Sequence, residues 1–146
     1  MITFNAGEII SDSAAATEAI AGELVKLLPD GGVVALHGDL GAGKTVFCRG
    51  IARALGISEA ITSPTFNLVL EYTAGTMPLY HMDLYRINGS DDALACGIDD
   101  YLGESGAICV IEWAERIADI LPSDAVKISI RHVSPEVRTI RIEQRT

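Results

Sequence analysis

Eight consecutive residues in this chain carry the complete pattern of a phosphate-binding loop. They run from Gly38 to Thr45 and match G-x-x-x-x-G-K-S/T. In such a loop the glycines allow successive backbone N–H groups to face inward at the start of a helix, which creates a nest for anions. Lys44 would reach the β- and γ-phosphates of a nucleotide, and the Thr45 hydroxyl would bind Mg²⁺. The residues that we predict to bind the nucleotide here are Gly38, Asp39, Leu40, Gly41, Ala42, Gly43, Lys44, Thr45 and Val46.

The segments on either side of this loop are those that a phosphate site needs. Residues 33–36 form a short apolar run that predicts a buried strand, and residues 46–55 predict a helix that Gly56 ends. The alternative is a glycine-rich turn that binds nothing. The full pattern arises rarely by chance in a chain of this length, and the flanking strand and helix make that rarer still. The sequence therefore favours a nucleotide site.

Two acidic residues at predicted strand ends are candidates for the remaining chemistry. Glu112 directly follows the apolar run 107–111, where a carboxylate can complete the Mg²⁺ shell of a phosphate loop. Asp83 lies within residues 81–86 and could position the attacking water. Each also has a simpler interpretation, as a carboxylate that faces solvent. With the loop upstream, the predicted catalytic residues are Lys44, Asp83 and Glu112, and the predicted metal ligands are Thr45 and Glu112.

A segment rich in hydroxyl groups follows the predicted helix. Residues 62–66 read Thr-Ser-Pro-Thr-Phe. Such a segment could act as a switch that senses the γ-phosphate through Mg²⁺ and hydroxyl contacts. It could equally be a proline turn with capping hydroxyls. The residues alone leave both interpretations open.

The chain predicts one domain that spans residues 1–146, because its length is typical of one folded unit. The predicted strands are 1–5, 33–36, 68–72, 77–85, 107–111, 125–132 and 137–143. Residues 73–76 are predicted to join two of these strands in a hairpin. The order indicates an α/β sheet with added antiparallel strands.

Two further segments predict helices. Ser11 or Asp12 is a candidate N-cap for a helix that runs to about Leu28, with apolar residues at helical spacing. Residues 114–120 predict a short helix that ends near a proline. Residues 89–104 contain five acidic residues and no basic one, and predict helix or loop.

The overall composition limits the classes of function. The net charge of −9 argues against unaided binding of nucleic acid, because affinity for phosphate backbones comes mostly from Lys and Arg. No apolar run approaches the roughly 20 residues that span a membrane, and no secretory signal is visible. The three cysteines lack C-x-x-C spacing, which suggests reduced thiols. We therefore expect a cytoplasmic protein that binds neither membranes nor nucleic acid directly.

Four motifs, in this order and spacing, resemble the bacterial TsaE (YjeE) family: GDLGAGKT, SPTF, HMDLYR and IEW. The resemblance covers residues from about 10 to 140. It implies a P-loop NTPase-like fold, in which helices flank a central mixed β-sheet. It also implies a Mg²⁺-dependent ATPase that is required to make N6-threonylcarbamoyladenosine in tRNAs decoding ANN codons. Proteins of this family bind a TsaB–TsaD heterodimer and support its repeated turnover, so that tRNA is reached indirectly through the complex.

The resemblance also implies roles for individual residues. Lys44 and Thr45 match the Lys and Thr of the family's phosphate loop, and Thr65 lies in the matching switch-like segment. Asp83 matches the acidic residue of HMDLYR, and Glu112 matches that of IEW. Both acidic residues are thought to act around magnesium and the attacking water.

Trp113 matches the aromatic residue that lies beside the nucleotide in the family. The chain has Ala114 after it, where the family usually has Pro, so the turn after the strand is less restrained. The acidic segment 91–104 is a possible docking surface for the partner complex. Its simpler interpretation, an ordinary solvated face, is favoured by composition.

Other nucleotide-binding classes have to be weighed. A small-molecule kinase usually supplies arginines from a lid, but only Arg86 falls between residues 54 and 115. Three arginines in the C-terminal strands keep that reading open: Arg131, Arg138 and Arg141. A GTPase is disfavoured because the chain has no N-K-x-D motif. A nucleotide-gated binding module, whose hydrolysis only times the release of a partner, overlaps with the family's role.

The sequence does not identify the residues that hold the base of the nucleotide. Two regions are candidates. One is the start of the first helix, around Ile10 and Ser11, and the other is the pair of C-terminal strands.

Overall fold

The protein folds around one seven-stranded sheet with the order β1-β7-β6-β2-β5-β4-β3. The computed structural model describes residues 8–38, 43–62, 64 and 68–144. The strands are β1 (Glu8–Ser11), β2 (Gly32–Gly38), β3 (Val69–Tyr72), β4 (Leu79–Asp83), β5 (Ile108–Glu112), β6 (Val126–His132) and β7 (Arg138–Gln144).

The centre of the sheet is parallel and its margins are antiparallel. Strands β6, β2, β5 and β4 run parallel to one another, whereas β3 pairs antiparallel with β4, and β7 pairs antiparallel with both β6 and β1. The predicted α/β sheet with added antiparallel strands is therefore confirmed, as is the hairpin that joins β3 to β4. Because the central strands are parallel, their carboxyl ends lie together at one edge.

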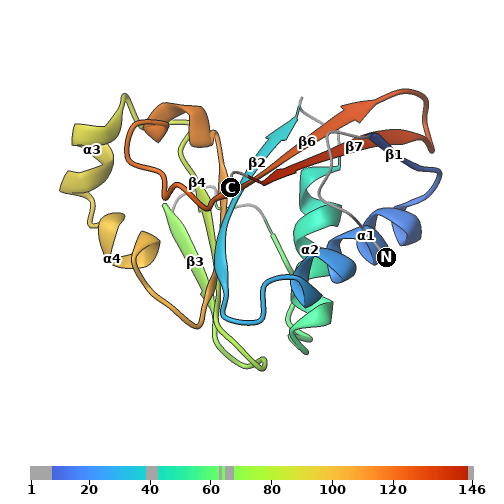
Figure 1. The fold of residues 1–146 in the computed structure, drawn as a ribbon, viewed down its shortest axis with the longest axis horizontal. Helices are drawn as coiled ribbons and strands as arrows, with labels where there is room; N and C mark the ends of the chain where they lie inside the picture. The colour runs from blue at the N-terminus through green and yellow to red at the C-terminus, as the bar shows by residue number, and fades with distance from the viewer. Residues whose placement is uncertain (1–7, 39–42, 63, 65–67, 145–146) are drawn as a thin grey trace.

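Helices cover both faces of the sheet (Figure 1). One face carries the two long helices, α1 (Ala14–Lys26) and α2 (Lys44–Ala54). The other carries three short elements, namely α3 (Ser90–Ala95), α4 (Asp99–Leu102) and the 3₁₀ helix η1 (Ala114–Ile117). The acidic segment of the sequence analysis forms α3 and α4, and so lies on the face opposite α1 and α2. No helix among the described residues is both long and apolar enough to cross a membrane.

Side chains alternate between the two faces along each central strand. In β2, Val34 and Leu36 join the core under α1 and α2, whereas Val33 and Ala35 join the core on the other face. In β5, Val110 belongs to the α2 face in the same way. This alternation explains why the inner strands consist of continuous apolar runs, since both of their faces are buried.

The two long helices approach each other closely at Gly50 of α2. A Cβ atom built on Gly50 would lie 2.6 Å from the backbone oxygen of Glu18 and 2.8 Å from the Cβ of Ala21. Glu18 of α1 also binds two arginines of α2, with its carboxylate 2.9 Å from Arg53 Nη1 and 3.8 Å from Arg49 Nη1. Close backbone contact and ion pairs therefore hold α1 against α2.

The N-terminal region differs from the prediction. Helix α1 begins at Ala14 and is capped by Ser13, whose side chain accepts a hydrogen bond from Ala16 N, so neither Ser11 nor Asp12 is the cap. Ser11 instead ends β1, a strand that the sequence did not predict. Its hydroxyl is buried and bonds to Thr17 Oγ1 at 2.7 Å. The strand predicted over 1–5 lies outside the described residues.

Two helix ends were also predicted wrongly. Helix α1 ends at Lys26 rather than near residue 28. The helix predicted over 114–120 is a single 3₁₀ turn, Ala114–Ile117. Helical spacing of apolar residues over so short a stretch does not distinguish one 3₁₀ turn from a longer α-helix.

Candidate functional site

The candidate site lies where the carboxyl ends of β2, β4 and β5 meet the start of α2. Glu112, the last residue of β5, is paired in register with Leu36 of β2 on one side and with Asp83 of β4 on the other. Helix α2 begins at Lys44, six residues after Gly38 ends β2, and Lys44 lies at this same edge. Residues far apart in the sequence are thereby brought to one place.

The described ends of the phosphate loop have the backbone that the motif requires. Gly38 ends β2, and Gly43 precedes α2 with φ 105°, a left-handed conformation that L-residues with side chains adopt rarely. A side chain at Gly43 would therefore be strained. The middle of the predicted loop, Asp39, Leu40, Gly41 and Ala42, lies outside the described residues, so its contacts stay a prediction. Val46 lies in the first turn of α2.

Three charged side chains form a buried chain of contacts at this edge. Lys44 Nζ lies 3.5 Å from Glu112 Oε1, and His81 Nε2 lies 2.7 Å from Glu112 Oε2. His81 is completely buried and Glu112 is 5% exposed. The two oxygens of one carboxylate are therefore engaged by different partners, one on α2 and one on β4.

The pKa values follow from these contacts. Burial alone would lower the pKa of His81, but its contacts with the Cys48 thiol and with Glu112 outweigh burial and raise the pKa to about 10. Burial alone would raise the pKa of Glu112, but His81 and then Lys44 outweigh it and hold that pKa below its usual value. At neutral pH the pair is an imidazolium and a carboxylate.

Asp83 lies beside this cluster but is less buried. Its Oδ1 accepts a hydrogen bond from Tyr85 N at 2.9 Å, so the carboxylate caps the turn that follows β4. Burial raises the pKa of Asp83, the Tyr85 hydrogen bond opposes that rise, and the charge of Glu112 adds to it. A carboxylate whose pKa is raised is a better proton acceptor, which suits a group that would orient a water molecule.

Trp113 stands next to Lys44, as predicted for a residue beside the loop. Its φ of 61° is the one left-handed backbone among the non-glycine residues that the structure describes, and this is rare for a bulky side chain. The Lys44 Nζ atom lies 5.9 Å from the Trp113 ring centroid, and Arg116 Cζ lies 5.3 Å from it. The ring centroids of Tyr85 and Trp113 are 5.1 Å apart. The unusual backbone therefore places an aromatic ring over the loop lysine.

The two regions named from the sequence as candidates for the base lie side by side. Ser11 of β1 pairs in register with Arg138 of β7. The Nε atom of Arg138 lies 3.8 Å from the position that a Cβ would take on Gly43. Arg138 Nη1 also donates to the backbone oxygen of Ser134 at 2.8 Å. The positively charged side chain of Arg138 thus lies near Gly43, where the phosphate loop meets α2. The two candidate regions are therefore adjacent.

Most of the proposed switch segment lies beyond what the structure describes. Thr65 and its neighbours at 63, 66 and 67 lie outside the described residues, so the switch stays a prediction. The flanking Thr62 donates its backbone N–H to the Tyr72 hydroxyl at 3.5 Å.

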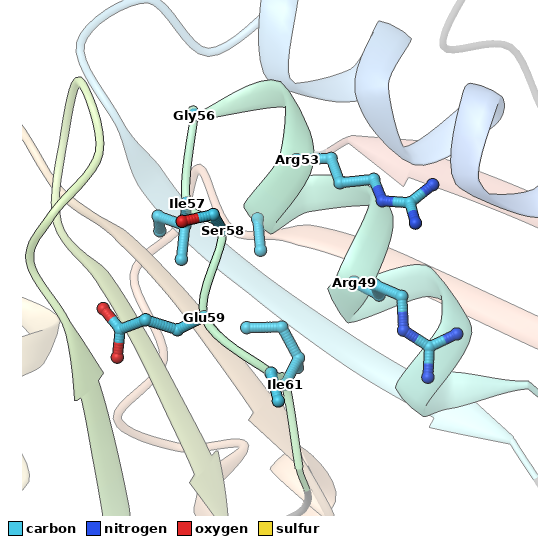
Figure 2. A pocket seen from close by; sticks show the side chains of 9 residues that line it. Arg49, Arg53, Gly56, Ile57, Ser58, Glu59 and Ile61 are labelled. Carbon is cyan, nitrogen blue, oxygen red and sulfur yellow. The ribbon is translucent and has the colours of Figure 1, made fainter.

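A cavity of about 550 Å³ lies at the other end of α2, away from the charged cluster (Figure 2). Arg49 and Arg53 come from α2, and Ile57, Ser58 and Ile61 come from the segment that follows the helix. Neither Lys44 nor Glu112 lines this cavity. We therefore assign the chemistry to the charged cluster, because reactive groups converge there.

The oxygen groups at the site suit a hard divalent cation. Glu112 has one carboxylate oxygen held by His81, while the other faces Lys44 at the start of α2. Thr45 follows Lys44 in the first turn of α2, and Asp83 is the register partner of Glu112. Mg²⁺ in proteins is typically held by one or two carboxylates together with hydroxyl groups, phosphates and water. The residues present therefore fit such a cation.

His81 is the member of this charged cluster that sequence reasoning missed. The HMDLYR motif contains it, two positions before Asp83 and therefore on the same face of β4. That spacing was the available signal. Its contact with Glu112, 31 positions away, depends on the parallel pairing of β4 with β5.

Comparisons with known proteins agree with the motifs. The profile of the family described as "Threonylcarbamoyl adenosine biosynthesis protein TsaE" matches residues 11–140. The tRNA threonylcarbamoyladenosine biosynthesis protein TsaE of Bacillus subtilis is 42% identical over 85% of this chain and 77% of its own length. The protein of the same name from Treponema pallidum is 46% identical over 80% of this chain and 85% of its own.

The fold also has a solved counterpart. The crystal structure of YdiB from Bacillus subtilis superposes with a TM-score of 0.74 and 35% sequence identity, covering 96% of this chain and 86% of that one. Family, sequence and fold therefore agree. This chain belongs to the TsaE family of tRNA threonylcarbamoyladenosine biosynthesis proteins.

Proposed function

We propose that this chain is a single P-loop NTPase-like domain that hydrolyses ATP with Mg²⁺ and supports N6-threonylcarbamoyladenosine formation on tRNA through a TsaB–TsaD-type complex. The observation that carries the proposal is the contact between Lys44 Nζ and Glu112 Oε1, 3.5 Å apart, at the start of α2. It joins the lysine of a phosphate-loop motif to a strand-end carboxylate. That combination is the one used to hold a nucleotide and its metal ion.

Each residue of the cluster has a task in this proposal. Lys44 binds the β- and γ-phosphates, and its release from Glu112 leaves that carboxylate for the cation. Asp83, with its raised pKa, orients the attacking water and accepts its proton. Bound Mg²⁺ would supply charge neutralisation at the phosphates, with Thr45 and Glu112 as its protein ligands.

The partner proposal rests on the family and on charge. Relatives carry the name of the tRNA modification pathway, so proteins of that pathway are the candidate partners. The chain's net charge of −9 makes unaided capture of tRNA unfavourable, so we propose that tRNA is reached through the partner complex.

Alanine substitutions of Lys44 and Thr45 test the nucleotide site. Lys44→Ala should lower the affinity for Mg²⁺·ATP or the rate of hydrolysis by at least about tenfold, which is about 1.4 kcal/mol. Thr45→Ala should have an effect of similar size. Lys26→Ala is the matched control, because Lys26 is an exposed lysine of α1 whose ion pair is with Glu23 of the same helix. Binding and hydrolysis like the wild type in both Lys44→Ala and Thr45→Ala would refute the site.

Partner dependence is tested by measuring hydrolysis under three conditions: with the chain alone, with a TsaB–TsaD complex, and with that complex and tRNA. We expect slow hydrolysis by the chain alone and faster hydrolysis with the complex. Fast hydrolysis that partners leave unchanged, together with phosphate transfer to a metabolite, would support a small-molecule kinase instead.

A further inference from the structure

One buried residue at the candidate site has no role in the proposal so far. His81 lies in β4 on the face that packs against α2 and is completely shielded from solvent. Leu79, two positions earlier on the same face, is an equally buried apolar residue of the core. Packing alone would be satisfied by an apolar side chain at position 81 as well. A histidine at this place therefore calls for a specific reason.

The contacts of His81 indicate that reason. Its Nε2 lies 2.7 Å from Glu112 Oε2, a short distance that is typical of a charge-assisted hydrogen bond. Its Nδ1 has no hydrogen-bond partner of ordinary geometry within the described part of the chain. Apart from its contact with the Cys48 thiol, the ring therefore has one hydrogen bond of ordinary geometry, and that bond is with the carboxylate.

That contact determines where the other carboxylate oxygen lies. A glutamate side chain has several rotatable bonds, and ordering them costs free energy when a ligand binds. With Oε2 held by β4, Oε1 is directed to the start of α2, where it contacts Lys44. Partners that orient a metal-binding side chain in this way commonly affect metal affinity by about 10- to 100-fold.

We propose that His81 is a positioning residue for Glu112, holding Oε2 so that Oε1 faces the cation that accompanies the nucleotide. This inference rests on the proposed nucleotide and Mg²⁺ site. It assigns to His81 the pre-organisation of that site, and it assigns no direct contact with the nucleotide.

Two amide variants test the inference. In His81→Gln the side-chain NH₂ can occupy the place of Nε2 and still donate to Glu112, whereas in His81→Asn the shorter side chain cannot reach it. ADP affinity is measured by calorimetry, with Mg²⁺ and with EDTA. We expect His81→Asn to reduce the Mg²⁺-dependent gain in affinity by about tenfold or more, with the affinity in EDTA unchanged. His81→Gln should keep the gain within about threefold of the wild type.

A variant of the next residue controls for packing. Met82 is as buried as His81 but points to the opposite face of β4, where its sulfur lies 3.9 Å from Cys109 Sγ. Met82→Val should lower stability and leave the Mg²⁺-dependent gain unchanged. The inference is overturned if His81→Asn keeps the full gain, or if it weakens ADP binding equally with Mg²⁺ and with EDTA. If the wild type itself shows no binding or no gain, the proposed function fails instead.

A measurement that needs no substitution of His81 covers the case in which the His81 variants do not fold. With ¹⁵N-labelled histidine, the His81 ring should show a proton on Nε2 whose resonance moves when Glu112 is changed to Gln. An Nε2 without a proton, or a resonance that does not respond to Glu112→Gln, would overturn the inference.

Discussion

The interface between α1 and α2 and the carboxyl edge of β2, β4 and β5 are both largely buried, but they depend on different forces. Close packing dominates the interface, where the arginines paired with Glu18 are exposed, and charge dominates the edge. At the interface, Gly50 allows the backbones to approach within a distance that no side chain would permit. At the edge, Lys44 and His81 each contact one oxygen of the Glu112 carboxylate. A change of volume should therefore damage the first region, and a change of charge the second.

The difference teaches where function resides. Burying charged groups costs several kcal/mol of desolvation per ion, and apolar residues of similar volume are often as good for stability. The α1–α2 interface shows that this chain builds tight apolar contacts elsewhere, for example around Leu24, Phe47 and Ile51. The charged edge is therefore best explained by the ligand chemistry proposed for it, and substitutions can separate the two regions.

The largest effect is expected at the interface. Gly50→Val would place side-chain atoms against the Glu18 backbone, where even a Cβ would lie within 2.7 Å of the Glu18 Cα. The helices must separate, so the free energy of unfolding should fall by about 3 kcal/mol or more. Urea unfolding measures it. Nucleotide affinity of the remaining folded protein should be close to that of the wild type.

Gly22→Ala is the control for that experiment. Gly22 lies in α1, opposite α2, but a Cβ there would meet only Ala54 Cβ, at an ordinary 3.8 Å. Replacing a helical glycine with alanine should raise stability by about 0.5–1 kcal/mol. Equal losses in Gly50→Val and Gly22→Ala would show that any side chain added at this interface is destabilising, and that the close approach at Gly50 is not the cause.

The next largest effect is expected at the charged edge. Glu112→Gln leaves His81 buried without its counter-charge, so the free energy of unfolding should fall by about 2–3 kcal/mol. The similar shape of the two side chains would by itself suggest almost no change of stability, but loss of the buried charge opposite His81 predicts a decrease. ATP hydrolysis should fall by at least about tenfold. Thermal and urea unfolding, with a hydrolysis assay, measure both effects.

Asp83→Asn provides the comparison within the same edge. Asp83 is only partly buried. Its carboxylate accepts a hydrogen bond from the backbone N–H of Tyr85, and an Asn oxygen can accept the same bond. Stability should change by less than about 0.5 kcal/mol, whereas hydrolysis should fall as for Glu112→Gln. Full partner-stimulated hydrolysis in either variant would mean that its proposed role is wrong.

The inner strands of the sheet and its edge strand β1 differ in how well the sequence predicts them. The inner strands β2 and β5 were predicted to within two residues at each end, because strands buried on both faces are continuous apolar runs bounded by polar residues. Strand β1 was missed. It has four residues at the edge of the sheet, and Ile10 within it is 71% exposed, so no alternating pattern marks it. Its existence depends on pairing with β7, a contact between the two ends of the chain.

The site was predictable as far as local motifs reach. Lys44 and Glu112 could be named because a phosphate-loop lysine and a strand-end carboxylate each have a sequence signal. The role of His81 could not be derived, because it requires knowing that β4 lies parallel and adjacent to β5. The left-handed backbone of Trp113 has no sequence signal either, since this conformation is unusual for a bulky residue.

A smaller effect is expected from pH. The pKa of His81 is raised from 6.5 to about 10 on folding, so the stability that its charge contributes is fully present below about pH 6.5 and is lost as the pH rises toward 10. The free energy of unfolding should fall by up to about 2 kcal/mol between pH 7 and 8.5, at about 1.4 kcal/mol per unit. Urea titrations without nucleotide at the two pH values measure it.

The other shifted groups act outside that pH window. The pKa of His37 is lowered, chiefly by burial, so its effect on stability appears on the acid side of 6.5. Burial raises the pKa of the Cys109 thiol to about 12, so its effect begins near pH 9. His81→Gln should therefore remove most of the slope between pH 7 and 8.5. An equal slope in His81→Gln and the wild type would show that another group is responsible.

The last prediction concerns the fluorescence emission of Trp113, which should report on the charged edge and not on the α1–α2 interface. Trp113 is the only tryptophan of the chain, and its ring lies 5.9 Å from Lys44 Nζ. Binding of ADP or ATP should change its emission, because phosphates would draw the lysine charge away from the ring and add negative charge nearby. The alternative is that Trp113 is a core indole, which would report no ligand. Emission unchanged at a nucleotide concentration that calorimetry shows to be saturating would favour it. Gly22→Ala should keep the full change in emission. Lys44→Ala should show a smaller change even at nucleotide concentrations high enough to restore binding, because the lysine charge is then absent.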